Sequence, residues 1–309
     1  MVKPPSFLLK GLGGSCISAV FQEDSRKNVA FSVGRIIIIL IIPDQRRTNM
    51  KFIDMHTHVY PDVIAAKAAQ NIRNYYHLGD DMDGTVFTLL ERGSSVGVTQ
   101  YLILPVAVKP EHVHTINSFT RQQVQSQPSF VGFGTVHAAM ENMIEEVSVI
   151  ESMGLKGIKI HPDCQHFNID DPRLFPLYEH IQGRLPMMMH LGDENYDYSH
   201  PARLRRVLDL FPKLQVCAAH FGGHTMYDTA KEYLSDTECI LDISSTLMFL
   251  DKKTAEGYIN HYGAERLAFG SDYPVFDPVR EMELFLALDL TPEQKEQIAW
   301  KTAARFLNL

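Results

Sequence analysis

Eight short apolar segments recur along the chain, and each is followed by a stretch with helical spacing. Near-continuous apolar runs of this kind are typical of buried parallel strands, whereas strands with one exposed face alternate between apolar and polar residues. From residue 157 onward the segments are almost evenly spaced, with one strand and one helix in each unit. The predicted strands are 52–55, 100–106, 130–136, 157–162, 185–190, 214–220, 239–243 and 266–272.

The stretches between these strands predict helices, and the last helix opens with a Thr-Pro-Glu capping signature at Thr291. The longest gap between strands follows the first strand and contains the Gly- and Asp-rich segment 79–84, so we expect an insertion over the active-site face. The pattern favours an α/β fold, a (β/α)₈ TIM barrel with an insertion after strand 1 and a C-terminal helix. An open doubly wound sheet is the alternative, weakened by the absence of a glycine fingerprint after the first strand. The predicted helices are 62–73, 86–92, 117–124, 142–153, 174–181, 201–211, 225–234, 252–262, 278–288 and one from residue 291.

The first 49 residues do not share this rhythm. Their one apolar block, 36–42, is too short to span a bilayer, where about 20 residues are needed. The sequence Arg46-Arg47-Thr48-Asn49-Met50 matches a translated ribosome-binding site, spacer and start codon. We therefore interpret residues 1–49 as a disordered or non-native N-terminal extension and residues 50–309 as the barrel. A genuine extra strand or tail is the alternative.

Composition and charge limit the classes of molecule that the protein is expected to bind. A formal net charge of -8 speaks against nucleic acid or an anionic membrane as the main partner. Four cysteines without a CxxC pair or a disulfide framework indicate a reducing compartment, so we expect a cytoplasmic protein. A small molecule is the expected substrate, and a homodimer is the expected assembly on frequency alone.

Polar residues stand where the predicted strands end, which is where a TIM barrel places its chemistry. The first strand ends in a His-x-His pair, whose rings share one face because strand side chains alternate. Each such residue alone has an ordinary interpretation as a hydrogen-bonded loop or turn residue, but five strands that end this way indicate a metal site. Neutral imidazoles with one carboxylate suit one divalent ion, Zn²⁺ first and Mn²⁺ second. The residues are His56, His58, Lys159, His161, His190, His220 and Asp272.

Several motifs carry a resemblance to a known family. They are His56-Thr57-His58, residues 157–162, His190-Leu191-Gly192-Asp193, residues 219–223, residues 269–274 and the closing 303–307. With these motifs, residues 50–309 resemble the amidohydrolase superfamily. Within it they resemble the amidohydrolase-related branch, which holds metal-dependent hydrolases alongside aminocarboxymuconate-semialdehyde and resorcylate-type decarboxylases.

The resemblance implies roles for five residues. His56, His58, His190 and Asp272 match metal ligands, and His220 matches the residue that polarises the substrate or positions the attacking water. Binding to a metal lowers the pKa of water to about 7. Asp272, the only acid of the set, would take the proton of that water and deliver it to the leaving group.

Three functions follow from this set of residues. Our first expectation is a metal-dependent hydrolase of a C–N, C–O or lactone bond. The alternative is a metal-dependent non-oxidative decarboxylase. A catalytically inactive barrel is disfavoured, because all five metal-site residues are present.

Other positions are open to two interpretations. Lys159 matches a site where some superfamily members carry a carbamylated lysine between two metals, but we favour an ammonium that pairs with an acid such as Asp54, and therefore one metal. Arg203 either holds a substrate carboxylate or pairs with Asp209 or an acidic loop. His224 stands where the branch often has an aromatic residue. The residues expected to contact substrate are His161, Lys159, Tyr60, Arg203 and Phe221.

Overall fold

The computed structural model describes residues 8–10, 16–18, 28–33, 36–41, 50–77 and 79–309. The chain divides into two compact units, Met1–Thr48 and Asn49–Leu309. In the first unit, β1 (Leu8–Lys10) pairs antiparallel with β2 (Cys16–Ser18), and β3 (Asn28–Val33) pairs antiparallel with β4 (Ile36–Ile41). The sequence did not predict these strands. Residues 46–49, on which the proposed start at Met50 rests, lie outside the described residues, so that interpretation stays a prediction.

Parallel strands form the centre of the second unit. One sheet has the order β5-β6-β7, and the other has the order β8-β9-β10-β11-β12-β13. Phe133 alone separates β7 from β8, so the predicted third strand is present but interrupted. The strands are β5 (Phe52–Thr57), β6 (Val98–Ile103), β7 (Phe130–Gly132), β8 (Gly134–Thr135), β9 (Ile158–Ile160), β10 (Met187–Met189), β11 (Val216–Ala218), β12 (Ile240–Asp242) and β13 (Leu267–Ala268).

Backbone hydrogen bonds connect the first of these strands to the last. The Met55 N–H donates to the Phe269 carbonyl at 2.9 Å, and the Asp272 N–H donates to the His56 carbonyl at 2.8 Å. Thr57 and Tyr273 form a parallel bridge beyond them. These bonds bring the start and the end of the unit side by side, as the predicted TIM barrel requires.

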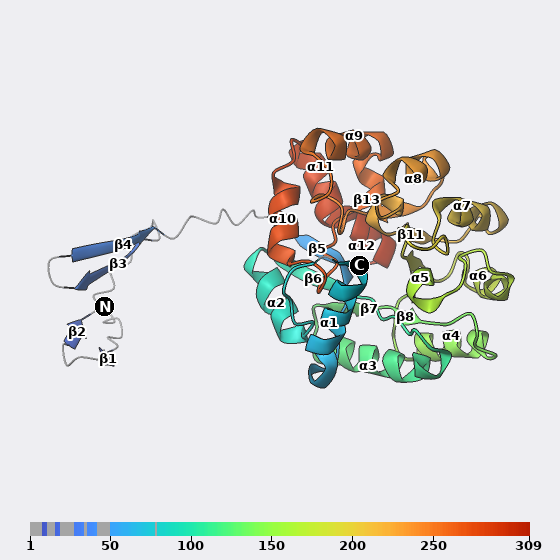
Figure 1. Cartoon of the computed structure of the whole chain (residues 1–309), viewed down its shortest axis with the longest axis horizontal. Helices are drawn as coiled ribbons and strands as arrows, with labels where there is room; N and C mark the ends of the chain where they lie inside the picture. The colour runs from blue at the N-terminus through green and yellow to red at the C-terminus, as the bar shows by residue number, and fades with distance from the viewer. Residues whose placement is uncertain (1–7, 11–15, 19–27, 34–35, 42–49, 78) are drawn as a thin grey trace. The chain divides into compact units, whose positions relative to one another are not determined.

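Helices follow the strands and surround them (Figure 1). Each predicted helix is present, with ends shifted by a few residues. Among the described residues, every helix is either too short or too polar to span a bilayer. The helices of four or more residues are α1 (Asp62–Tyr76), α2 (Val86–Ser95), α3 (Val113–Ser126), α4 (Met143–Ser152), α5 (Pro162–Gln165), α6 (Phe175–Ile181), α7 (Pro201–Leu210), α8 (Tyr227–Leu234), α9 (Lys252–Tyr262), α10 (Pro278–Leu286), α11 (Pro292–Glu296), the π-helix η5 (Gln297–Lys301) and α12 (Thr302–Leu307).

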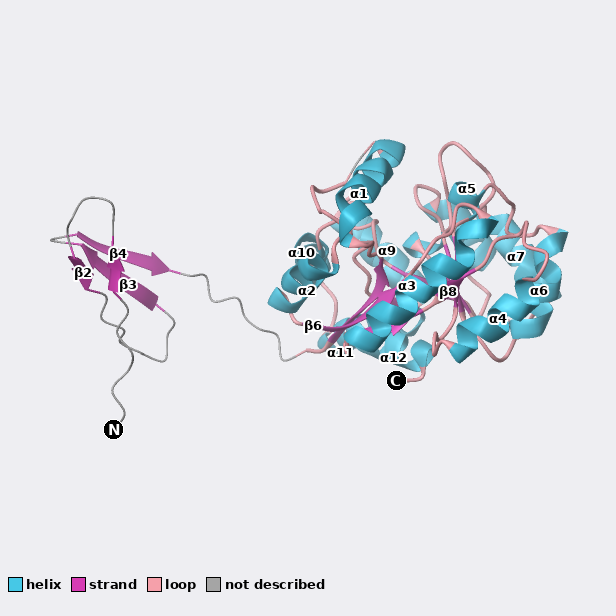
Figure 2. Cartoon of the chain, turned by 90° about the horizontal axis from the view of Figure 1, so that it is seen from below, coloured by secondary structure: helices cyan, strands magenta, loops and turns pink. Residues whose placement is uncertain are grey.

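Two hydrophobic clusters stabilise the unit. The larger one lies between the strands and the surrounding helices. The smaller one fills the space that the strands surround. It contains strand residues such as Met55, Leu102 and Met188, and α12 adds Ala303 and Leu307. The C-terminal helix therefore covers one end of the strands, while α1 and α5 lie at the other end (Figure 2).

The insertion after the first strand consists of α1 and the loop that leads to α2. Thr85 caps α2 by accepting a hydrogen bond from the Thr88 N–H, while α1 ends at His77 in the left-handed conformation. Because α1 lies at the end of the strands that carries the histidines, the insertion forms part of the candidate site, as predicted.

Among the residues that the structure describes, both clusters draw their members from position 50 onward. A chain that begins at Met50 should therefore unfold at the same denaturant midpoint as the full chain, since it keeps every described member of both clusters. Urea unfolding followed by circular dichroism would check this. A clearly lower midpoint for the shortened chain would mean that the first unit supports the barrel.

Candidate active site

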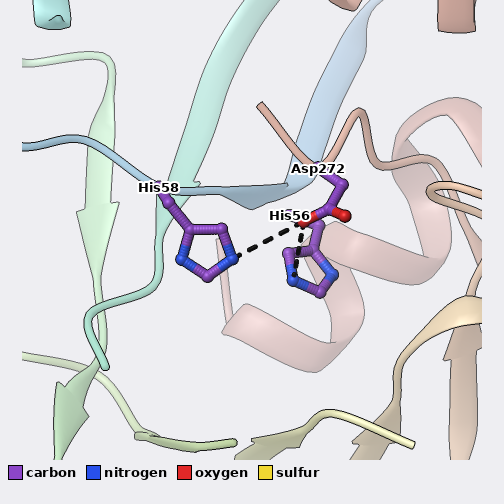
Figure 3. A group of neighbouring side chains, drawn as sticks. All are labelled: His56, His58 and Asp272. Carbon is purple, nitrogen blue, oxygen red and sulfur yellow. Dashed lines mark ion pairs between the residues drawn. The ribbon is translucent and has the colours of Figure 1, made fainter. Parts of the chain in front are cut away.

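Three side chains converge at the ends of β5 and β13: His56 and His58 from the end of β5, and Asp272 from the segment that follows β13 (Figure 3). The Nε2 atoms of His56 and His58 lie 3.5 Å and 3.6 Å from Oδ1 of Asp272. All three residues are buried. Asp272 adopts a left-handed backbone conformation with φ of 59°, and Ser245 Oγ donates a 2.5 Å hydrogen bond to its other oxygen. The carboxylate is thus held with one oxygen facing both rings.

Hydrogen bonds on the far side of each ring determine which nitrogen carries the proton. His56 Nδ1 lies 3.0 Å from Oδ2 of Asp242, and His58 Nδ1 lies 2.5 Å from the Leu104 carbonyl. Both partners only accept, so each Nδ1 donates. In a neutral ring the Nε2 atom then keeps its lone pair. Both lone pairs face the Asp272 carboxylate.

The same logic applies to His190 and His220. His190 Nε2 donates to the Gly192 carbonyl at 2.9 Å, and His220 Nδ1 donates to the Ser244 carbonyl at 3.0 Å. The remaining nitrogens, Nδ1 of His190 and Nε2 of His220, lie only 3.1 Å apart. Two lone pairs at this separation repel unless a proton or a metal cation lies between or beside them. The arrangement therefore calls for a positive charge at this point.

Burial keeps the rings of His56 and His190 neutral. It lowers the pKa of His56 and of His190 well below the ordinary value, and the neighbouring Lys159 and His161 respectively lower it further. Burial by itself would raise the pKa of Asp272, but His56, His58 and His220 outweigh it, so the pKa of this carboxyl lies below its usual value. Neutral imidazoles beside an ionised carboxylate are the protonation states that a divalent ion needs.

The spacing of the donors fits a metal ion. Two ligands on one tetrahedral ion, with bonds of about 2.1 Å, lie about 3.4 Å apart, close to the separations between His56, His58 and Asp272. These three offer ligand atoms within 4.8 Å of one another. His190 is outside that group and stays a predicted fourth ligand. It forms a second candidate group with His161 and Asp163.

The sequence analysis missed Asp242 and Ser244. Asp242, at the end of β12, is fully buried. One oxygen accepts from His56, and the other accepts from Ser244 Oγ at 2.5 Å and from the His220 N–H at 3.3 Å. An acid at the end of the seventh strand was the available signal, since five other strands had been selected on the same criterion. Carboxylates of this kind orient histidine ligands.

Lys159 points inward beside His56 and is fully buried. Its Nζ lies 3.2 Å from Nε2 of His56. Burial lowers the pKa of Lys159 to about 8, although Asp242 and Asp272 act in the opposite direction. The expected pairing with Asp54 is wrong, because the one hydrogen-bonded oxygen of Asp54 accepts from the backbone N–H groups of His56 and Ser271.

A cavity of about 320 Å³ opens onto the metal-facing residues. Of the residues expected to contact substrate, Tyr60 and His161 line it. The insertion helix contributes Ile72 and Tyr76, and α5 contributes Cys164, none of which the sequence analysis selected. The full lining is His56, His58, Tyr60, Ala68, Asn71, Ile72, Tyr76, Val106, Val108, His161, Cys164, His190, Asp272 and Val275.

Two other expected contacts lie elsewhere. The ring of Phe221 packs near Tyr227 and Tyr258 in the outer core, with centroid distances of 6.5 Å and 6.0 Å. Its left-handed backbone, with φ of 53°, turns the side chain that follows His220 toward the helices. Arg203 binds Asp170 and Asp197, each at 2.9 Å, so two carboxylates already engage its guanidinium. Neither residue lines the cavity. This corrects the expectation for Phe221, whereas for Arg203 it agrees with the stated alternative that the guanidinium pairs with acidic loop residues.

Most of the chain is similar to known proteins. Residues 53–309 match the family model described as amidohydrolase. The chain belongs to the amidohydrolase family. A curated relative, the 2-amino-3-carboxymuconate-6-semialdehyde decarboxylase of Dictyostelium discoideum, is 23% identical over 237 residues, which are 63% of this chain and 66% of the relative. The chain thus spans about two thirds of that relative's length.

Solved structures share the fold. An uncharacterized TIM-barrel protein from Bordetella bronchiseptica superposes with a TM-score of 0.72 at 22% identity, over 84% of this chain and 99% of that protein. A dihydroxybenzoic acid decarboxylase from Polaromonas, with bound manganese and the inhibitor 2-nitroresorcinol, gives 0.66 at 16% identity, over 84% and 97%. These structures confirm the predicted TIM-barrel fold.

Asp242→Asn should weaken metal binding about 10- to 100-fold without unfolding the protein. Three donors occupy one side of Asp242, so the new amide group would face His56 Nδ1 and reverse its tautomer, leaving a hydrogen on the metal-facing nitrogen. Metal titration monitored by calorimetry would measure the loss. Asp170→Asn, which alters a buried carboxylate outside the cavity, is the matched control. Equal affinities in both variants would contradict the assigned role of Asp242.

Proposed function

We propose that this protein is a metal-dependent, non-oxidative decarboxylase of a small carboxylic acid. The decarboxylase names of the curated relative and of the Polaromonas structure support this alternative better than our first expectation of a hydrolase. We extend the proposal to an aromatic or similarly unsaturated acid, because the cavity has apolar walls from Ile72, Val106, Val108 and Val275 around a polar floor.

One observation carries the proposal. An ionised carboxylate, Asp272, faces tautomer-fixed imidazoles on the floor of a cavity whose walls include several apolar side chains. Such a floor binds the carboxylate of a substrate through a cation, while the apolar walls hold its ring and accept the uncharged CO₂ that leaves.

In the proposed reaction, different residues would hold the metal ion and transfer the proton. His56, His58, His190 and Asp272 would hold one divalent ion. When bound, the ion would supply a positive charge that orients the substrate carboxylate and stabilises the negative charge developing at the carbon. Asp272 takes up a proton from a substrate hydroxyl or from water and hands it to the carbon that loses CO₂. Because the pKa of this carboxyl is below its usual value, it releases a proton readily. His220, whose Nδ1 donates to the Ser244 carbonyl, presents the lone pair of Nε2 and would accept a hydrogen bond from a substrate hydroxyl or water there.

We propose one metal ion per chain. The donor set of neutral imidazoles with one carboxylate suits Zn²⁺ and Mn²⁺, and the bound manganese of the Polaromonas decarboxylase favours Mn²⁺ for this chain. Lys159 remains an ammonium beside His56 in this proposal. A second ion bridged to the first by a carbamylated Lys159 would contradict this proposal.

Metal-loaded protein should release CO₂ from members of a panel of hydroxybenzoates and unsaturated carboxylic acids, and should leave lactones and amides intact. Asp272→Asn should lower that release by at least about 10³-fold with little change in the unfolding midpoint, since it removes both a metal ligand and the proton carrier. Headspace CO₂ and ring-opening assays on the same samples would decide between the reactions. Hydrolysis of a lactone or amide without CO₂ release would restore the hydrolase.

A further inference from the structure

Tyr76 is the last residue of α1, the helix that the insertion adds, and it lines the cavity. Its ring centroid lies 6.3 Å from that of His190 and 6.1 Å from that of His224. Its hydroxyl lies 2.9 Å from Nε2 of His161. The phenol thus stands beside the candidate metal ligands, although nothing in the proposed reaction yet uses it.

The direction of the bond between Tyr76 and His161 follows from the other side of the imidazole. The backbone N–H of Cys164 donates to His161 Nδ1 at 3.4 Å. A backbone N–H can only donate, so Nδ1 keeps its lone pair and the neutral ring carries its hydrogen on Nε2. His161 therefore donates to the Tyr76 oxygen. Cys164 Sγ, at 3.6 Å from the same nitrogen, is the weaker acceptor. The O–H of Tyr76 is left free to donate elsewhere.

The cavity needs such a donor. Among the described residues that line it, none is a lysine or an arginine. A carboxylate substrate held at the metal site still carries oxygen lone pairs that burial would leave without partners, at a substantial cost.

We propose that Tyr76, polarised by His161, is an oxyanion subsite that donates a hydrogen bond to an anionic oxygen of the substrate. The proposal rests on the proposed decarboxylase function, because that function supplies the carboxylate or phenolate to be recognised. The chain of bonds runs from the Cys164 N–H through His161 to Tyr76 and then to the substrate. Donors linked in this way strengthen one another, and a bond to a charged oxygen is stronger than one to a neutral oxygen. The insertion helix thereby contributes to substrate selection.

Calorimetric binding of 2-hydroxybenzoate and of its neutral counterpart, 2-hydroxybenzamide, to the manganese-loaded protein tests the subsite. Tyr76→Phe should weaken binding of the benzoate about tenfold or more and that of the benzamide by less than about threefold. Tyr75→Phe is the matched control, because the neighbouring Tyr75 donates to Asp193 at 3.1 Å and does not line the cavity. If Tyr76→Phe weakens both ligands equally, or neither, the subsite is refuted.

A second readout depends on neither substrate nor turnover. Side-chain ¹⁵N NMR should show His161 with its hydrogen on Nε2, assigned by its loss in His161→Gln, and Tyr76→Phe should speed the exchange of that hydrogen. A hydrogen on Nδ1 would overturn the proposal, since the Tyr76 O–H would then be used by His161. Binding of the benzoate without CO₂ release would refute the decarboxylase reaction alone. CO₂ release by the wild-type protein, combined with equal effects of Tyr76→Phe on the two ligands, would refute the subsite alone. A wild-type protein that neither binds the benzoate nor releases CO₂ would refute both the subsite and the decarboxylase reaction.

Discussion

The site depends on hydrogen bonds that lie behind its rings. Asp242 and the carbonyls of Leu104, Gly192 and Ser244 each accept a hydrogen bond from the N–H of one histidine ring, and the opposite nitrogen of that ring is left with a lone pair facing the site. Without a cation, the lone pairs of His190 Nδ1 and His220 Nε2 would face each other at 3.1 Å. Backbone carbonyls cannot change their hydrogen-bonding role, so the fold itself determines that this end of the barrel binds a positive charge.

The barrel provides those carbonyls at fixed positions. Parallel strands carry their carboxyl ends to one edge, and the segments just beyond the strands supply both the rings and their partners. Left-handed backbone at His220, Phe221 and Asp272 turns the chain sharply at these points. For Asp272 the turn brings the carboxylate toward the first strand, and for Phe221 it removes the ring from the cavity into the outer core. A left-handed backbone conformation therefore places Asp272 in the site and Phe221 in the hydrophobic core.

Much of this could be predicted from the sequence, because strand ends and histidines are both visible in it. The strand and helix order, the insertion, the C-terminal helix and the convergence of His56, His58 and Asp272 follow from the apolar pattern and from the His-x-His pair. What failed depends on side-chain direction. Phe221 was expected in the pocket because it follows a predicted strand, but the sequence does not reveal the left-handed backbone that turns its ring away. For Arg203 the sequence left two interpretations open, and only the structure shows that Asp170 and Asp197 engage it. Tyr76 was missed because its hydrogen-bond partner, His161, is distant in the sequence.

The most direct test of the central claim is a crystal structure of the manganese-loaded protein with anomalous scattering recorded at the manganese edge. We predict one anomalous peak per chain, bound by Nε2 of His56, Nε2 of His58, Nδ1 of His190 and a carboxylate oxygen of Asp272, with the hydrogen bonds behind the rings unchanged. A peak held only by His161, Asp163 and His190, or no peak at saturating manganese, would contradict the account.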